Sequence, residues 1–217
     1  LDSGEGTELR RELRYTPSSA GELRIEASLE ADALSIDDRR STVCIVREAV
    51  KVLLVDGRPS GVPFENGTDC LRLALSPEGL GGSVGRMEPT VLTDGRLLSA
   101  NLDDFDVVFL CDVPLVTDRE AQLLANYVTS GGSLVISAGP NLRPEAYNQT
   151  LLTEQLPLLP ARLGDLIGNA KDREQTFGFE GGEFEHPILQ PFRGNPNTGF
   201  ELTQTFAYVK SFPFESA

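Results

Sequence analysis

The sequence predicts an α/β protein in which a doubly wound, mostly parallel sheet follows an N-terminal antiparallel β segment. Three observations predict this class. Apolar and polar residues alternate over 22–29, largely apolar runs of strand length occupy 51–55, 106–110 and 133–137, and a strong helix signal separates the last two runs. Alternation is typical of a strand with one buried face, and a continuous apolar run is typical of a strand covered on both faces. Strand, helix and strand at this spacing indicate a right-handed βαβ unit.

The antiparallel segment is expected to span residues 1–48. Its alternating strand is followed by a turn at Asp37 and Asp38 and by a second apolar run over 42–46. Leu13 and Tyr15 are expected on an earlier strand of the same layer. These strands are too few to close a sandwich, so we expect further strands to come from outside the segment.

The second predicted domain spans residues 49–217 and begins with the buried strand over 51–55. This strand ends in Asp-Gly-Arg-Pro at 56–59, and a glycine-rich loop follows. The elements expected next are a short helix over 69–75, a strand over 87–92, a helical turn over 97–102 and a strand over 106–110.

The clearest helix signal begins at Thr117. Thr117 is a good N-cap and Glu120 completes a capping box. The helix ends at Gly131-Gly132, where a left-handed C-terminal cap is expected. Its apolar stripe consists of Leu123, Leu124, Tyr127 and Val128.

Beyond Pro144 the local signals are weaker. Residues 151–159 are apolar but interrupted by prolines, and 164–182 are expected to form a loop or a hairpin. Residues 204–212 are predicted to form a final strand, after which the domain is expected to be truncated. The chain opens without a methionine, so we expect it to be a piece of a longer protein.

Composition narrows the function classes. The formal charge is −14, from 33 acidic and 19 basic residues. Such a charge opposes binding to nucleic acid and to anionic lipid, and its plainest interpretation is solubility. The longest apolar runs are far shorter than the roughly 20 residues of a membrane helix. Three widely spaced cysteines match neither a disulfide framework nor a zinc site, and neither a phosphate-binding glycine loop nor a calcium loop is present, so no metal or cofactor is expected.

Four polar side chains are candidates for a ligand site because they end predicted parallel strands. These are Asp56, Cys111, Asp112 and Ser137. Open α/β sheets bind ligands at the carboxyl ends of their strands, so a small ligand could lie there. The alternatives stay open: the aspartates could cap turns, and Cys111 could be a small buried hydrophobe.

Two segments, 50–57 and 105–139, resemble the class I glutamine amidotransferase-like superfamily. The likeness is closest to its non-catalytic relatives, such as ThuA-like proteins. Residues 29–39, which precede the first segment, are similar to large bacterial membrane proteins that join BatA-type and von Willebrand A-type regions to such a domain. The resemblance implies a flavodoxin-like or amidotransferase-like sheet, a membrane-anchored bacterial parent and a location outside the cytoplasm.

The chain departs from the catalytic pattern of that superfamily. Active members carry a nucleophilic cysteine in a G-x-C-x-G turn, but here Val135 replaces the first glycine and Ser137 replaces the cysteine. A serine hydroxyl needs a positioned base, and the one histidine is His186. Ile188 stands where the superfamily has an acidic partner for the histidine. The resemblance therefore implies a pseudoenzyme.

The sequence supports three hypotheses about function. The first is a non-catalytic protein-interaction or scaffold module of a larger membrane-anchored bacterial protein, with an unknown protein partner. The second is a hydrolase or amidase that uses Cys111 or Ser137 with His186 as base. The third is a sensor that binds a small ligand at the strand edge, in a pocket lined by the four candidate residues.

Overall fold

The computed structural model describes residues 13–29, 36, 38–77, 86–154, 157–172, 175–179, 186–194, 199 and 202–214. The chain divides into two compact units. One comprises Leu1–Val50 with Leu80–Arg86, and the other comprises Lys51–Gly79 with Met87–Ala217. The predicted α/β class is confirmed, since the described residues form a four-stranded parallel sheet and an N-terminal antiparallel pair.

The first unit contains a two-stranded antiparallel ribbon, β1 (Gly21–Ser28) with β2 (Arg39–Val46). Both strands were predicted. Leu13 and Tyr15, however, are exposed and form no strand, so that prediction is wrong. Two alternating apolar residues bury too little surface to offset the entropy of ordering an extended segment. Of the predicted turn, Asp38 is buried and residue 37 lies outside the described residues.

The ribbon's register assigns its side chains to two faces. Leu23 lies opposite Cys44 and Ile25 lies opposite Thr42, so these four share one face. Val43 and Ile45 lie on the other face, opposite charged residues of β1. β2 therefore carries apolar side chains on both of its faces.

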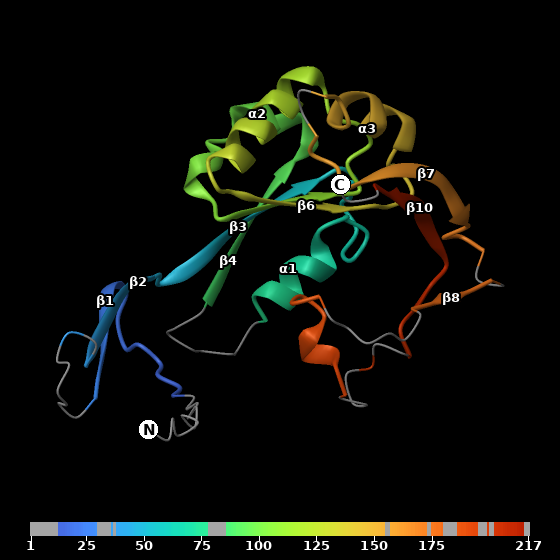
Figure 1. Ribbon diagram of the computed structural model, residues 1–217. Helices are drawn as coiled ribbons and strands as arrows, with labels where there is room; N and C mark the ends of the chain where they lie inside the picture. The colour runs from blue at the N-terminus through green and yellow to red at the C-terminus, as the bar shows by residue number, and fades with distance from the viewer. Residues whose placement is uncertain are drawn as a thin grey trace, which may run out of the picture. The chain divides into compact units, whose positions relative to one another are not determined.

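The parallel sheet of the second unit has the strand order β4-β3-β5-β6 (Figure 1). Its strands are β3 (Ala49–Asp56), β4 (Arg86–Thr93), β5 (Val107–Cys111) and β6 (Ser133–Ser137). After β3 the chain adds β4 on one side and then returns to add β5 on the other. The strand order thus reverses between β3 and β5, which is where open sheets of this kind bind ligands.

Helices cover both faces of the sheet. Figure 1 shows α2 (Asp118–Thr129) and α3 (Pro144–Leu151) on one face of the sheet and α1 (Asp69–Leu75) on the other. A hydrophobic core lies between the sheet and the helices α2 and α3. Burying one Leu or Val side chain contributes about 1.5–3 kcal/mol, so this core dominates the stability of the unit. Its strand residues, packed beneath α2 and α3, are Leu53, Val55, Val108 and Leu110.

The capping box predicted for α2 is confirmed. The Thr117 hydroxyl accepts the N–H of Glu120, and the Glu120 carboxylate accepts the N–H of Thr117 at 2.8 Å. Such a box satisfies two backbone donors that the first turn leaves free. Gly131 has φ of 99°, as the predicted left-handed end of the helix requires.

The predicted helical turn over 97–102 is replaced by two 3-10 helices, η1 (Asp94–Ser99) and η2 (Leu102–Asp104). Leu97 and Leu102 are buried and join the core under α2. Because the Ala100 N–H bonds to the Leu97 carbonyl and Ala100 itself is extended, the first helix ends before Leu102.

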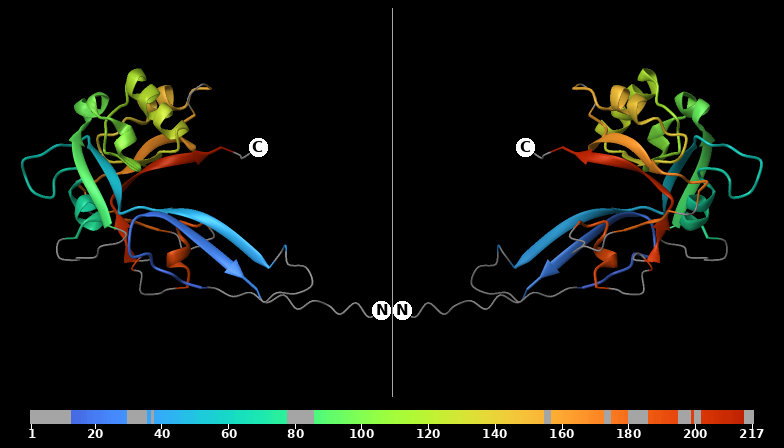
Figure 2. Two further views of the ribbon diagram at one scale, coloured as in Figure 1. Left: turned by 90° about the vertical axis from the view of Figure 1, so that its left-hand side faces the viewer. Right: turned by 90° about the vertical axis from the view of Figure 1, so that its right-hand side faces the viewer.

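Beyond Pro144 the structure contains elements that the sequence did not predict. Helix α3 starts at Pro144, a residue well suited to a first helical position. β7 (Ala161–Gly168) pairs with β10 (Ala207–Pro213) in an antiparallel ribbon, seen side by side in Figure 2. The expected loop or hairpin over 164–182 is therefore wrong at Gly164–Gly168. The predicted last strand is split into β9 (Gln204–Thr205), which pairs with β8 (Phe177–Gly178), and β10, and the remaining described element is η3 (Gln190–Phe192).

Candidate functional site

The four candidate residues lie along one edge of the sheet. In the register of the parallel strands, Asp56 of β3 is paired with Cys111 of β5, and Cys111 is paired with Ser137 of β6. Asp112 follows β5 directly, and its N–H donates to the Ser137 carbonyl at 2.9 Å. The structure thus brings together the carboxyl ends of three neighbouring strands, as the sequence predicted.

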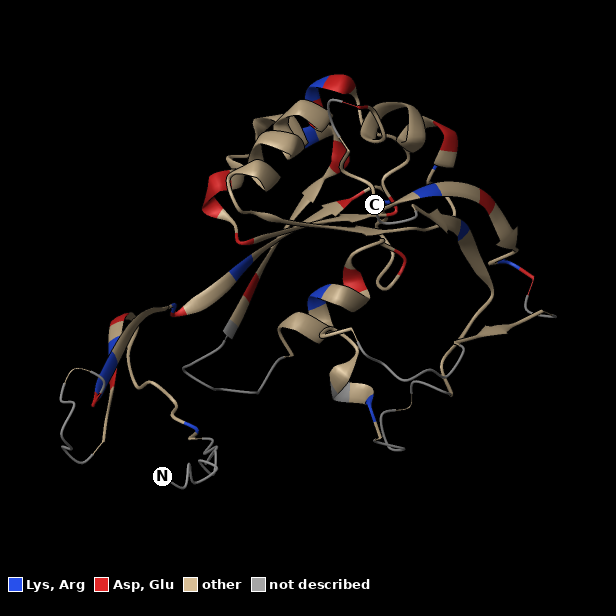
Figure 3. Ribbon diagram, viewed as in Figure 1, with Lys and Arg blue, Asp and Glu red and all other residues tan. Residues whose placement is uncertain are grey.

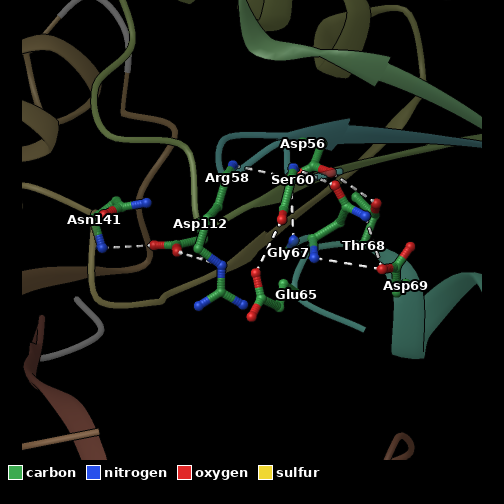
Figure 4. A network of polar contacts seen from close by, with 10 residues as sticks. Asp56, Arg58, Ser60, Glu65, Gly67, Thr68, Asp69, Asp112 and Asn141 are labelled. Atoms are coloured by element: carbon green, nitrogen blue, oxygen red, sulfur yellow. Dashed lines mark hydrogen bonds and ion pairs between the residues drawn. The ribbon is translucent and has the colours of Figure 1, made fainter. Parts of the chain in front are cut away.

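Asp56 is a buried anchor for the loop that follows β3. Its Oδ1 accepts the backbone N–H groups of Arg58 at 2.9 Å and Gly67 at 3.1 Å (Figure 4). Its Oδ2 accepts the hydroxyl of Thr68 at 3.1 Å. Both carboxylate oxygens are therefore used by the protein itself, which fits the turn-capping interpretation of this residue.

Asp112 has one carboxylate oxygen in use and one without a hydrogen bond. The residue is only 5% exposed, and its Oδ1 accepts the N–H of Asn141 at 2.8 Å. Oδ2 has no hydrogen-bond partner among the described residues. The nearest cation is Arg58, whose Nε lies 3.8 Å from Oδ2 and whose side chain is 44% exposed. A buried carboxylate oxygen left without a donor is costly, so it calls for an explanation.

The backbone around Asp112 is unusual as well. Asp112 has φ of 52°, a left-handed conformation that costs of order 1–3 kcal/mol in a residue other than glycine. Two glycines approach it so closely that neither could carry a side chain. A Cβ at Gly57 would collide with the Asp112 carbonyl oxygen, and one at Gly139 would collide with its carboxyl carbon. Strained and closely packed backbone of this kind is concentrated at functional sites.

Cys111 is buried behind these aspartates. Burial, and to a lesser extent the negative charges of Asp56 and Asp112, together raise the pKa of its thiol to about 11. The thiol is therefore protonated at neutral pH, and only the thiolate is a good nucleophile. Here Cys111 behaves as a small buried hydrophobe.

Ser137 and His186 are both exposed, on different segments of the chain. His186 Nδ1 accepts the backbone N–H of Ile188 at 3.3 Å, so this nitrogen is engaged within its own turn. Within the described part of the chain, His186 makes no hydrogen bond to Ser137 or to Cys111. The hydrogen bond between base and nucleophile that the hydrolase hypothesis needs is therefore not formed.

The loop from Gly57 to Thr68 is the part of the site that the sequence did not single out. The Ser60 N–H donates to Asn66 Oδ1 at 2.6 Å, and the Asn66 side chain donates to Asp69 Oδ2 at 2.8 Å. Asp69 also accepts the N–H of Phe64 at 2.9 Å. The Asn66 side chain is the main cause of the lowered pKa of Asp69. The Asp-Gly pair at 56–57 and the Asn-Gly pair at 66–67 were available signals for this ordered loop.

Two cavities lie near this edge of the sheet. One, of about 310 Å³, is lined by the loop and by α1. The other, of about 510 Å³, lies beyond β6 and is bordered by Gly139, Pro140, Leu166 and Tyr208. Neither of these two cavities is lined by Asp56, Cys111, Asp112 or Ser137.

Two further observations concern metals and membranes. Among the described residues, no three His, Cys, Asp or Glu side chains are grouped so that they could hold a metal ion. In the same part of the chain, none of the helices has the length and apolar character needed to cross a membrane.

Comparison with known proteins adds no family to this picture. The chain matches no protein-family model, no curated protein and no solved structure. Its function is therefore inferred from its own residues and their geometry.

Proposed function

We propose that this chain is a non-catalytic protein-interaction or scaffold module of a larger, membrane-anchored bacterial protein that acts outside the cytoplasm. The resemblance to the non-catalytic branch of the class I glutamine amidotransferase-like superfamily implies such a parent protein. The strand order β4-β3-β5-β6 supports a flavodoxin-like or amidotransferase-like sheet. One observation carries the proposal, namely the apolar character of the β1–β2 ribbon on both faces.

This ribbon exposes side chains of the kind that bind other proteins. Val43 is 60% exposed and Ile45 is 75% exposed on one face, and Ile25 is exposed on the other. A strand that is apolar on both faces is typical of one enclosed on both sides, and a two-stranded ribbon by itself is only marginally stable. Covering each such side chain would stabilise a complex by about 1–3 kcal/mol. A protein partner that adds strands or a helix to the ribbon fits this surface.

A site-specific photocrosslinker tests the interaction in the full-length protein inside its own cells. A crosslinking residue at Ile45 is expected to capture a partner protein, because the ribbon would be covered there. The matched control is Gln122, which is exposed and polar on α2 and is expected to give no adduct. Adducts from Ile45 that join only the chain to itself would contradict the proposal, as would equal yields at the two positions.

The non-catalytic part of the proposal rests on two observations. The pKa of Cys111 is raised, and Ser137 has no hydrogen bond to His186 within the described residues. A shift from 9.0 to about 11 lowers the thiolate fraction near pH 8 roughly a hundredfold relative to an ordinary cysteine. Iodoacetamide at pH 8 is therefore expected to alkylate exposed Cys44 and Cys70 first and Cys111 last, as measured by mass spectrometry. Rapid alkylation of Cys111, or labelling of Ser137 by a fluorophosphonate, would contradict the proposal.

A second candidate function is the binding of a small ligand at the carboxyl edge of the sheet, and Asp112 favours it. Its Oδ2 is buried and has no hydrogen-bond donor among the described residues, although Arg58 lies 3.8 Å away. A ligand hydroxyl or ammonium group could supply the donor if the exposed Arg58 side chain moved aside, and the guanidinium would then bind a ligand oxygen.

Thermal unfolding tests this second function with defined sugars, polyols and amino acids. A compound that binds this site is expected to raise the unfolding temperature of the wild type and to have no such effect on Asp112→Asn. Asp103→Asn, a change at an exposed carboxylate of η2, is the control and should keep the response. The idea is wrong if every active compound stabilises Asp112→Asn as much as the wild type.

A further inference from the structure

The loop between β3 and α1 is a braced projection. Asp56 holds the start and the end of the loop through Arg58, Gly67 and Thr68. Asp69, at the start of α1, holds the middle by accepting the N–H groups of Phe64 and Asn66. Figure 4 shows the contacts of Asp56 with Arg58, Gly67 and Thr68. A braced loop loses little conformational entropy when it binds, which favours its use in recognition.

The tip of this projection is apolar and carries backbone strain. Phe64 is 68% exposed, and Val62 beside it is exposed as well. Phe64 has φ of 65°, which is a true outlier for a bulky residue. The structure thus places a large aromatic side chain in solvent at a position whose backbone would suit glycine better. Exposed aromatic side chains on braced loops are common anchors of protein contacts.

A hollow lies next to the tip on the same surface. The cavity of about 310 Å³ is lined by Val62, Pro63 and Phe64 from the loop and by Arg72 and Leu73 from α1. We call these five residues the Phe64 patch. Because a projection and a hollow lie side by side in it, the patch has the self-complementary form that a two-fold contact requires.

The charges around the Phe64 patch also suit a second copy. The chain as a whole carries −14, which makes two copies repel each other. The lining of the hollow, by contrast, carries one cation, Arg72, and one carboxylate, Asp69, so its charges are balanced. In a two-fold contact each copy can set its cation against the other's carboxylate. Figure 3 shows the acidic and basic residues of α1 and its neighbouring loop in close succession.

We infer that the Phe64 patch is a contact between two copies of this chain, with the Phe64 ring of each copy seated in the hollow of the other. The contact is isologous, since the same residues are used on both sides. The patch is small compared with standard protein interfaces, so the dimer is weak and depends on protein concentration. This surface is distinct from the β1–β2 ribbon.

Sedimentation equilibrium of the whole chain over a wide concentration range tests the inference. The wild type is expected to form dimers reversibly. Phe64→Gly is expected to weaken the dimer roughly tenfold or more, because it removes the anchoring ring. The same change is expected to leave the monomer's unfolding temperature unchanged or higher, because glycine accepts a positive φ without strain. Loss of the dimer with retained stability separates a contact role from a structural one.

Control variants make the outcome specific to this patch. Leu98→Ala removes another exposed apolar side chain, on η1, and should leave the dimer unchanged. Ile45→Ser on β2 should also leave it unchanged, so failure of the ribbon proposal is distinguishable from failure of this one. Phe64→Asn, which tolerates the left-handed backbone, replaces Phe64→Gly if that variant does not fold. A wild type that stays monomeric at every concentration overturns the inference, as does a dimer that survives both Phe64 changes.

Discussion

The parallel sheet and the β1–β2 ribbon are built from the same kinds of residue but bury them very differently. Val55 and Leu110 of the sheet are inaccessible to solvent, whereas Val43 and Ile45 of the ribbon are mostly exposed. The two central strands of the sheet, β3 and β5, have a paired strand on each side and helices on both faces, while each ribbon strand pairs with one neighbour. In both regions apolar residues specify a strand, but the number of covering elements decides whether that strand stabilises its own unit or offers a surface to a partner.

The largest expected difference between the two regions concerns single apolar truncations. Leu110→Ala should lower the free energy of unfolding by about 2–5 kcal/mol, because it leaves a cavity in the core beneath α2 and α3. Ile45→Ala should change it by less than about 0.5 kcal/mol, because the side chain is exposed. Urea unfolding followed by far-ultraviolet circular dichroism measures both. Equal losses of stability at the two positions would contradict the view that only the sheet residues stabilise their unit.

A smaller effect is expected where the sheet's edge is packed around Asp112. Gly139→Ala should destabilise the protein by about 1–3 kcal/mol, because the new Cβ would collide with the Asp112 carboxyl group. Gly95→Ala is the matched control, because a Cβ there would meet no atom within 4 Å. The same urea experiment distinguishes them. If Gly139→Ala lowers the free energy of unfolding no more than Gly95→Ala does, the close packing around Asp112 does not contribute to stability.

The smallest effect is expected at Tyr147, a buried residue of α3 whose hydroxyl donates to the Val113 carbonyl at 3.0 Å. Tyr147→Phe should cost about 1 kcal/mol at pH 7 through loss of this hydrogen bond.

The same change should alter the pH dependence of stability. Burial raises the pKa of Tyr147 above its ordinary value of 10.0, and the charges of Asp112 and Glu120 raise it further. Above pH 10 the unfolded chain therefore binds fewer protons than the folded one, and the free energy of unfolding falls as the pH rises. Cys111 acts in the same direction between pH 9.0 and about 11. Urea unfolding between pH 7 and 11 should show a shallower alkaline decline for Tyr147→Phe, and parallel curves would show that Tyr147 contributes nothing to it.

Elements with strong local signals were predictable, and those that depend on distant pairing were not. The capping box at Thr117 and Glu120 and the apolar run of β3 are read from neighbouring residues, and the structure confirms both. β7 was missed because Gly164 and Gly168 interrupt its pattern and its partner β10 lies far along the chain. Only that pairing makes the segment a strand.

The candidate site follows the same division. That Asp56, Cys111 and Ser137 meet at one edge could be predicted, because parallel strands bring their carboxyl ends together. The contact between Arg58 and Asp112 and the hydrogen bond from Asn141 could not be predicted, because these residues are brought together only by the packing of separate loops.

The sequence by itself determined the α/β class, the position of the parallel strands and the presence of a serine at position 137, because each of these depends on residue type and short-range period. The tertiary structure alone decided that the Cys111 thiol stays protonated, that one oxygen of Asp112 lacks a donor, and that Phe64 stands in solvent with a positive φ. The physical reason is that burial, electrostatic environment and backbone strain at a residue are set by neighbours distant in the chain, which local patterns do not encode.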